Sequence, residues 1–192
     1  ITAPCSLASS MFAAVSLEKK SAYEAVYRPS GQDLTFSLLG ALGLIAGCVL
    51  SFRGSIAQML VSLLGLLAGL SLGAGAVLRW KKKKPSAAFS VFVVLFYVAK
   101  LFRDFRHWEI NPAILDYCFS LFAMIAFMLA SYHAGAFSFE RGARRRLAFY
   151  SLLGVLFGAV SLAGAQLPEL LIYAGSVFWM LACAQQMLRR SV

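Results

Sequence analysis

The chain has 192 residues, of which 60% are hydrophobic and only 14% are charged, and its formal net charge is +10. A soluble domain averages about 25% charged residues, so this chain lacks the polar side chains needed to cover one large apolar core in water. Its Lys and Arg residues lie directly beside long apolar stretches, which favours anionic lipid headgroups over nucleic acid as partners. The composition therefore predicts an all-α integral membrane protein, held in the lipid bilayer.

Residues 1–33 differ from the rest of the chain. A mildly apolar stretch is followed by mixed charges and by Pro29 and Gly31. The segment lacks the ordered basic, apolar and small-residue regions of a signal peptide. We expect an N-terminal interfacial or linker segment here, followed by a transmembrane domain over residues 34–190.

That domain contains six apolar stretches, each close to the 17–25 residues that a tilted membrane helix needs. Prolines suit the first helical positions, and Asn111 before Pro112 suits an N-cap. Only Arg53 and Gly54 separate the first two stretches, which predicts a tight hairpin. The expected spans of this six-helix bundle are residues 34–52, 55–78, 86–102, 112–137, 147–165 and 168–188.

The distribution of positive charge predicts the orientation. With these spans, 14 of the 18 Lys and Arg residues fall on one side, mostly in the clusters at residues 79–84, 141–146 and 189–190. Loops rich in Lys and Arg stay in the cytoplasm. We therefore expect six transmembrane helices with both termini cytoplasmic, in a multi-pass protein of a bacterial plasma membrane.

One charged cluster lies on the side where cations should be scarce, at the outer end of the third span. Lys100, Arg103, Asp104 and His107 share one face of a continuing helix, and Asp116 lies one turn inside the fourth span. Charges near the membrane boundary are costly and often mark a site. We expect an outward-facing polar pocket at the junction of the third and fourth spans, suited to a carboxylate or phosphate. The candidate ligand-binding residues are Lys100, Arg103, Asp104, Arg106, His107 and Asp116.

A structural interpretation of the same charges remains open. Lys100 and Asp104 can pair at i, i+4, and the cluster can form a salt-bridge network that fixes the hairpin of the third and fourth spans. Lys100 and the arginines would then extend toward the outer headgroups.

Glycines recur at helical spacing in the first, second and fifth spans. Helices in lipid associate through small residues that let their backbones approach closely. We expect helix contacts at Gly43, Gly47, Gly65, Gly69, Gly154 and Gly158.

No motif in the chain indicates catalysis. The sequence patterns of hydrolytic nucleophiles, zinc peptidases and phosphate-binding loops are absent. His107 and His133 fall at opposite ends of their spans, too far apart to share a metal ion. The four cysteines form no CxxC pair, although Cys48 and Cys118 fall near the same outer face and leave a disulfide open. We expect no enzyme activity, no cofactor and no metal.

Two functions fit these features. The first is a component that binds or transports a small anionic metabolite. In size, span number and cytoplasmic termini, residues 34–188 resemble the substrate-binding S-components of energy-coupling-factor vitamin transporters, although the first outer loop here is much shorter. The alternative is a non-catalytic scaffold or accessory subunit of a membrane complex, whose glycine stripes would contact other membrane subunits.

Overall fold

The computed structural model describes residues 31–52, 55–81, 83, 85–108, 114–139 and 142–188, with the backbone alone at 107, 108 and 114–116. This part of the chain folds into long α-helices and two short 3₁₀ segments, without a strand, so the predicted all-α class is confirmed. The elements are α3 (Gly31–Leu50), α4 (Ile56–Trp80), α5 (Ala87–Trp108), α6 (Ile114–Ala136), η1 (Phe137–Phe139), α7 (Arg144–Ser161), η2 (Leu162–Gly164) and α8 (Leu167–Leu188).

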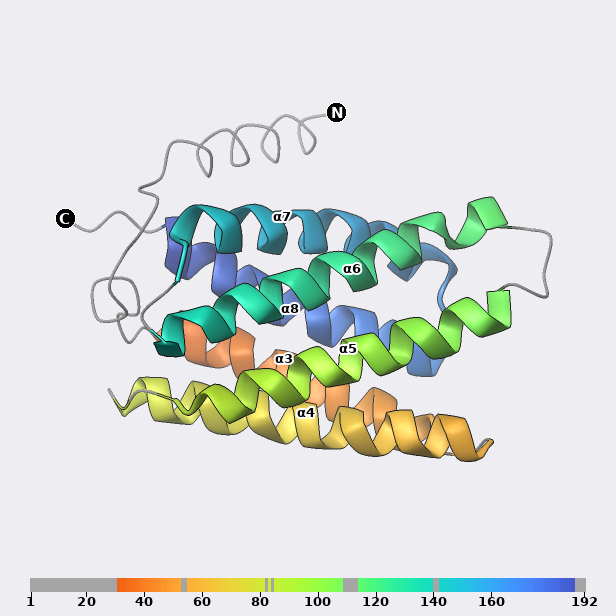
Figure 1. Cartoon of the computed structure of the whole chain (residues 1–192), viewed down its shortest axis with the longest axis horizontal. Helices are drawn as coiled ribbons and strands as arrows, with labels where there is room; N and C mark the ends of the chain where they lie inside the picture. The colour runs from red at the N-terminus through yellow and green to blue at the C-terminus, as the bar shows by residue number, and fades with distance from the viewer. Residues whose placement is uncertain are drawn as a thin grey trace.

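The helices form a ring in chain order. Each long helix packs against the next along the chain, and α8 packs against α3 to close the ring (Figure 1). We call the end where α4 finishes and α7 begins the basic end, because Arg79, Lys81 and residues 144–146 lie there. The other is the opposite end. The described chain starts and finishes at the basic end (Figure 1).

Large side chains fill the middle of the ring. Phe96, Tyr97 and Phe127 are fully buried, and the Tyr97 and Phe127 rings lie 5.5 Å apart between their centroids. The Tyr97 hydroxyl donates a 2.9 Å hydrogen bond to Ser176 on α8. The ring of helices is therefore a packed bundle, and one hydrogen bond connects α5 with α8 across its interior.

The expected helix limits agree with the structure to within a few residues, except at the end of α5. This helix continues to Trp108, beyond the predicted boundary at residue 102. It continues because its charged residues pair along the helix: Lys100 and Asp104 form an i, i+4 ion pair, which supports helical structure. The predicted N-cap at Asn111 and helix start at Pro112 lie outside the described residues.

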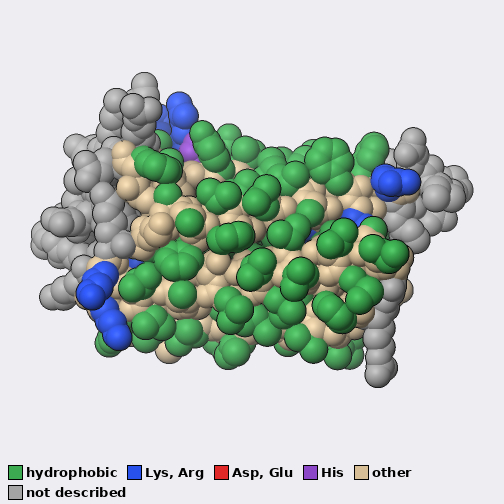
Figure 2. All heavy atoms as spheres, turned by 60° about the horizontal axis from the view of Figure 1, so that its bottom comes forward, with side chains coloured by type: hydrophobic (Ala, Val, Ile, Leu, Met, Phe, Trp, Pro, Cys, Tyr) green, Lys and Arg blue, Asp and Glu red, His purple; other side chains and the backbone are tan. Residues whose placement is uncertain are grey.

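The described part of the chain has five helices long and apolar enough to cross a membrane: α3, α4, α7, α8 and the segment Tyr117–Phe139, which covers α6 and η1. In the view of Figure 2, hydrophobic side chains cover the middle of the visible face, and Lys, Arg and His side chains lie toward its two ends. This fold is compatible with a multi-pass integral membrane protein. The remaining long helix, α5, is not among these five. It carries Lys100, Arg103, Asp104 and Arg106 near its end, so the six-span topology stays a prediction.

Candidate functional site

A polar cavity of about 250 Å³ lies at the opposite end of the bundle, between α3, α4, α5 and α8. Its lining combines two cations, one carboxylate, two amides and two hydroxyls with apolar side chains. We call it the opposite-end cavity. It is lined by Cys48, Leu50, Ser51, Gln58, Val61, Ser62, Phe96, Lys100, Arg103, Gln166, Pro168, Glu169 and Ile172.

Two cations of α5 share one buried carboxylate beside this cavity. Lys100 Nζ lies 2.6 Å from Asp104 Oδ2, and Arg103 approaches Oδ1 through Nε at 3.0 Å and Nη2 at 2.9 Å. Lys100 is only 1% exposed and Asp104 only 4%. Buried charges are tolerated when they are paired and hydrogen-bonded, and these contacts satisfy that condition. The carboxylate therefore holds both cations in fixed positions at the cavity wall.

The cations still have donors to offer a ligand. A lysine ammonium has three N–H donors and a guanidinium has five, and Asp104 takes only some of them. Lys100 Nζ also lies 5.8 Å from the centre of the Tyr173 ring, a cation–π distance. The cavity thus presents N–H donors from two cations, and Asp104 fixes the positions of both.

Glu169 gives the cavity an acceptor of opposite charge. Its Oε1 lies 4.0 Å from Arg103 Nη2, and its side chain is 43% exposed. Gln58 and Gln166 add amide groups that can donate or accept. This arrangement can bind an anion on one side and a hydroxyl or amino group on the other. Among the described lining residues, Cys48 supplies the one thiol and no histidine is present.

The predicted candidate residues are only partly gathered in this cavity. Lys100 and Arg103 line it, whereas Asp104 lies behind them and Arg106 is exposed outside the lining. The side chains of His107 and Asp116 lie outside the described residues.

The pocket was expected at the junction of the third and fourth spans, and most of that junction lies outside the described residues. The opposite-end cavity lies against α3, α4 and α8, because one face of α5 is continuous. Val93, Phe96 and Lys100 are buried at helical spacing, so the charges continue the inward-facing side of α5.

The remaining polar lining residues were not predicted as site residues. Ser51, Gln58, Gln166 and Glu169 all fall at the ends of expected spans on the same side of the membrane. That shared depth was a usable signal. The sequence did not indicate that α8 closes the ring against α3, and this closure is what brings Gln166 and Glu169 to the cavity.

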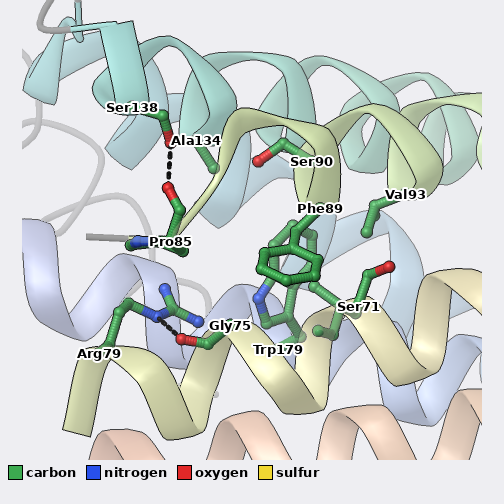
Figure 3. Close-up of a pocket in the computed structure, with 11 residues that line it drawn as sticks. Ser71, Gly75, Arg79, Pro85, Phe89, Ser90, Val93, Ala134, Ser138 and Trp179 are labelled. Carbon is green, nitrogen blue, oxygen red and sulfur yellow. Dashed lines mark hydrogen bonds between the residues drawn. The ribbon is translucent and has the colours of Figure 1, made fainter. Parts of the chain in front are cut away.

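A second, smaller cavity of about 50 Å³ lies toward the basic end, between α4, α5, α6 and α8 (Figure 3). It is lined in part by Ser71, Arg79, Ser90 and Trp179. Arg79 Nε donates to the Gly75 carbonyl at 3.2 Å, and Trp179 Nε1 has no hydrogen-bond partner among the described residues. A water site needs roughly 10–15 Å³ of such volume and polar partners, so this basic-end cavity can hold a few water molecules.

The two cavities share α4, α5 and α8 and lie at different depths along these helices. Phe96 lines the first and Val93 the second, one turn apart on α5. Ser176, which accepts from Tyr97, lies between Ile172 of the first cavity and Trp179 of the second. The region between the two cavities therefore includes Phe96 and the Tyr97–Ser176 hydrogen bond.

The glycines predicted to form helix contacts all face other helices or side chains of the bundle. A Cβ on Gly43 would lie 2.8 Å from Gly175 Cα, and one on Gly69 would lie 2.6 Å from Ile45. The remaining neighbours are Ile172 and Pro168 for Gly47, Cys48 and Phe96 for Gly65, Phe127 and Met180 for Gly154, and Val177 and Phe127 for Gly158.

Cys48 is buried next to Gly65, and no disulfide joins it to Cys118. Among the described residues, no group of three His, Cys, Asp or Glu side chains is placed to hold a metal ion.

Comparison with known proteins gave no match: no family model, no curated protein and no solved structure is similar to this chain.

Proposed function

We propose that this protein binds a small organic carboxylate in the opposite-end cavity, as a solute-binding or transport component of the membrane. The observation that carries the proposal is the pair of cations, Lys100 and Arg103, held at the cavity wall by the buried Asp104. A cavity lined by fixed polar groups within an apolar frame is the usual form of a small-molecule site. Its volume of about 250 Å³ restricts the ligand to a small solute.

A carboxylate suits this cavity better than a phosphate dianion. The planar guanidinium of Arg103 matches a carboxylate in geometry, whereas Glu169 would repel a second negative charge. Glu169 and the two glutamines can instead bind an amino or hydroxyl group elsewhere on the same solute. A ligand carrying one carboxylate and one such polar group would use all the polar groups around the cavity.

The basic-end cavity supports transport. It lies on α4, α5 and α8, which also wall the opposite-end cavity, at a different depth along the bundle. A solute carrier needs a binding site with access to either side and a barrier that can open between them. The Tyr97–Ser176 hydrogen bond between α5 and α8 is suited to be part of such a barrier.

The scaffold alternative drew on glycine stripes that would contact other membrane subunits. Each of these glycines contacts the chain's own helices, so the stripes support packing within the bundle.

Binding is tested by thermal unfolding of the purified protein in detergent, with sodium salts of acetate, lactate, succinate, glutamate and citrate, and with phosphate, at matched ionic strength. We expect at least one carboxylate to stabilise the wild type, by about 2.7 kcal/mol at a concentration of about 100 times Kd. The same salt should stabilise Arg106→Gln equally, since Arg106 is exposed outside the cavity, and should have little effect on Arg103→Gln.

Each variant is compared with its own unliganded melting temperature, because Arg103→Gln also removes bonds to Asp104. Stabilisation by phosphate alone would replace the carboxylate with a phosphate ligand. Equal shifts in all three proteins, or no shift with any salt, would reject the site. Uptake of the stabilising carboxylate into liposomes then distinguishes a carrier from a binding protein.

A further inference from the structure

A large groove runs along the outer surface of the bundle between α5 and α6, starting at the basic end. Its volume is about 660 Å³, which exceeds that of either cavity inside the ring. We call it the lateral groove. It is lined by Ala87, Ser90, Val91, Val94, Leu95, Tyr132, His133, Gly135, Ala136, Phe139, Ala143 and Arg146.

The floor of the groove is a close helix contact. A Cβ on Gly135 of α6 would lie 2.8 Å from Cβ of Ser90 on α5. The two helices touch there, so the groove is a furrow above their contact. It opens to the surface that a membrane-embedded bundle presents to lipid.

The polarity of the groove changes along its length. Ala87 begins α5 at the basic end, and Leu95 lies eight residues further on, roughly 12 Å along the helix. Val91, Val94 and Leu95 form this deeper, apolar part. One leaflet contributes about 15 Å of hydrocarbon to a bilayer. The apolar part of the groove therefore lies at the depth of the acyl-chain carbons nearest the headgroup.

The shallow part of the groove carries positive charge. Arg146, at the start of α7, lines it, and no Asp or Glu is found among its described lining residues. Arg146 also makes no ion pair with any residue in the described part of the chain. His133 lies beside it, and its ring is stacked on Tyr150 of α7 at 5.3 Å with an interplanar angle of 6°. The stacking thus fixes the imidazole in the groove that Arg146 also lines.

We propose that the lateral groove binds an anionic phospholipid from the leaflet at the basic end. The phosphate lies at Arg146 and His133, and one acyl chain lies along Val91, Val94 and Leu95. The order of the groups supports a lipid over a soluble anion, because the charge lies at the membrane boundary and the apolar wall extends toward the membrane centre. Basic pockets between membrane helices on the cytoplasmic side bind anionic headgroups in the same way. This site is separate from the opposite-end cavity.

The test is native mass spectrometry of the purified full chain with phosphatidylglycerol and phosphatidylcholine of identical acyl chains. We expect the wild type to retain phosphatidylglycerol in preference to phosphatidylcholine. One cation near a lipid surface contributes about 1 kcal/mol, so Arg146→Gln should weaken phosphatidylglycerol binding about fivefold and remove the preference.

Arg145→Gln is the matched control. Arg145 is the next residue on α7, is exposed and carries the same charge, but it does not line the groove. It should bind phosphatidylglycerol like the wild type. A second variant, Val94→Trp, fills the apolar part without changing any charge and should reduce binding of both lipids, while thermal unfolding checks that it is folded.

Several outcomes would overturn the proposal. Equal losses in Arg145→Gln and Arg146→Gln would indicate general attraction to the basic end. Unchanged binding in Val94→Trp would exclude the groove as the place of the acyl chain. Competition by inorganic phosphate or glycerol phosphate as effective as that by the lipid would assign the site to a soluble anion. Loss of solute binding at the opposite-end cavity would leave this result unaffected.

Discussion

Lys100 and Asp104 carry full charges inside a bundle whose other buried residues are mostly apolar. Taking such ions out of water costs several kcal/mol each, and only close pairing offsets that cost. The two members of the pair differ in their number of charged partners. Asp104 accepts hydrogen bonds from both Lys100 and Arg103. Lys100 has Asp104 as its one carboxylate partner among the described residues. Loss of the carboxylate should therefore be worse than loss of the amine.

This asymmetry gives a prediction for stability. Asp104→Asn keeps the shape of the side chain but leaves the Lys100 ammonium buried without its counter-charge, and removal of one partner of a buried pair costs about 3–5 kcal/mol. Lys100→Met leaves Asp104 with its hydrogen bond and its ion pair to Arg103, so its cost should be clearly smaller. Thermal or denaturant unfolding in detergent measures both.

Arg106→Gln serves as the control for loss of a charge from the same helix, because its side chain is exposed. If Lys100→Met proves as destabilising as Asp104→Asn, the carboxylate is not held by Arg103 as described. Equal stability of all three variants would mean that the pair is solvated and that the cavity is open to water at this depth.

At the scale of helices, α3 and α8 show how glycine determines packing. Gly40, Gly43 and Gly47 lie along one side of α3, and a Cβ on any of them would come within 3.0 Å of an α8 atom. Gly175 lies opposite, with the Gly40 carbonyl 2.7 Å from where its own Cβ would be. In lipid, such close backbone approach is a principal source of helix association. The contact that closes the ring therefore depends on four residues without side chains.

The prediction at this scale is that Gly43→Ala loosens the α3–α8 contact. The added methyl group would meet Gly175 Cα and the Leu171 carbonyl, which are backbone atoms that cannot rotate away. Overpacking of this kind costs about 1–3 kcal/mol, more than the roughly 1 kcal/mol that alanine gains over glycine in a helix. The free energy of unfolding should fall, and the opposite-end cavity should lose solute binding because α3 and α8 wall it.

Gly73→Ala is the matched control. Gly73 is a glycine in the middle of α4, where a Cβ would meet only Ala41 Cβ at 3.7 Å, an ordinary contact. This variant should be neutral or slightly more stable than the wild type. A Gly43→Ala protein as stable as Gly73→Ala would show that α3 and α8 can separate without cost.

The helices were predictable because each is a long apolar run bounded by charge, proline or glycine. The end of α5 was less so, since hydropathy falls at Lys100 although the helix continues through paired charges. Lys100 and Arg103 were predicted as site residues for their cost in the membrane. The position of their cavity was not predictable, because it depends on which helices become neighbours. The contact between α3 and α8 joins segments more than 100 residues apart, and Gly175 shows no sequence pattern that identifies it as the partner of Gly43.

On the scale of the whole molecule, the two ends of the bundle differ in chemistry. At the basic end, Arg145 and Arg146 are exposed, and Arg146 lines the lateral groove, where it can contact lipid phosphate. At the opposite end, Lys100 and Arg103 share the buried carboxylate of Asp104. Cations that follow the positive-inside rule serve orientation, whereas Lys100 and Arg103 have an internal partner. The proposed solute and lipid sites thus correspond to opposite faces of one membrane.

Two serines test this orientation directly. Ser55 and Ser86 are both exposed, and each accepts a hydrogen bond at the start of a helix, from Gln58 N and Ala88 N respectively, both at 3.4 Å. They therefore form a matched pair at the opposite end and the basic end.

In a background without native cysteines, a membrane-impermeant maleimide added to intact cells should label Ser55→Cys. It should label Ser86→Cys only after the membrane is opened, because the positive-inside rule predicts a cytoplasmic position for residues 81–86. The reverse pattern would invert the topology and place the solute cavity in the cytoplasm. Labelling of both residues in intact cells would mean that α4 does not cross the membrane, which would remove the basis for both proposed sites.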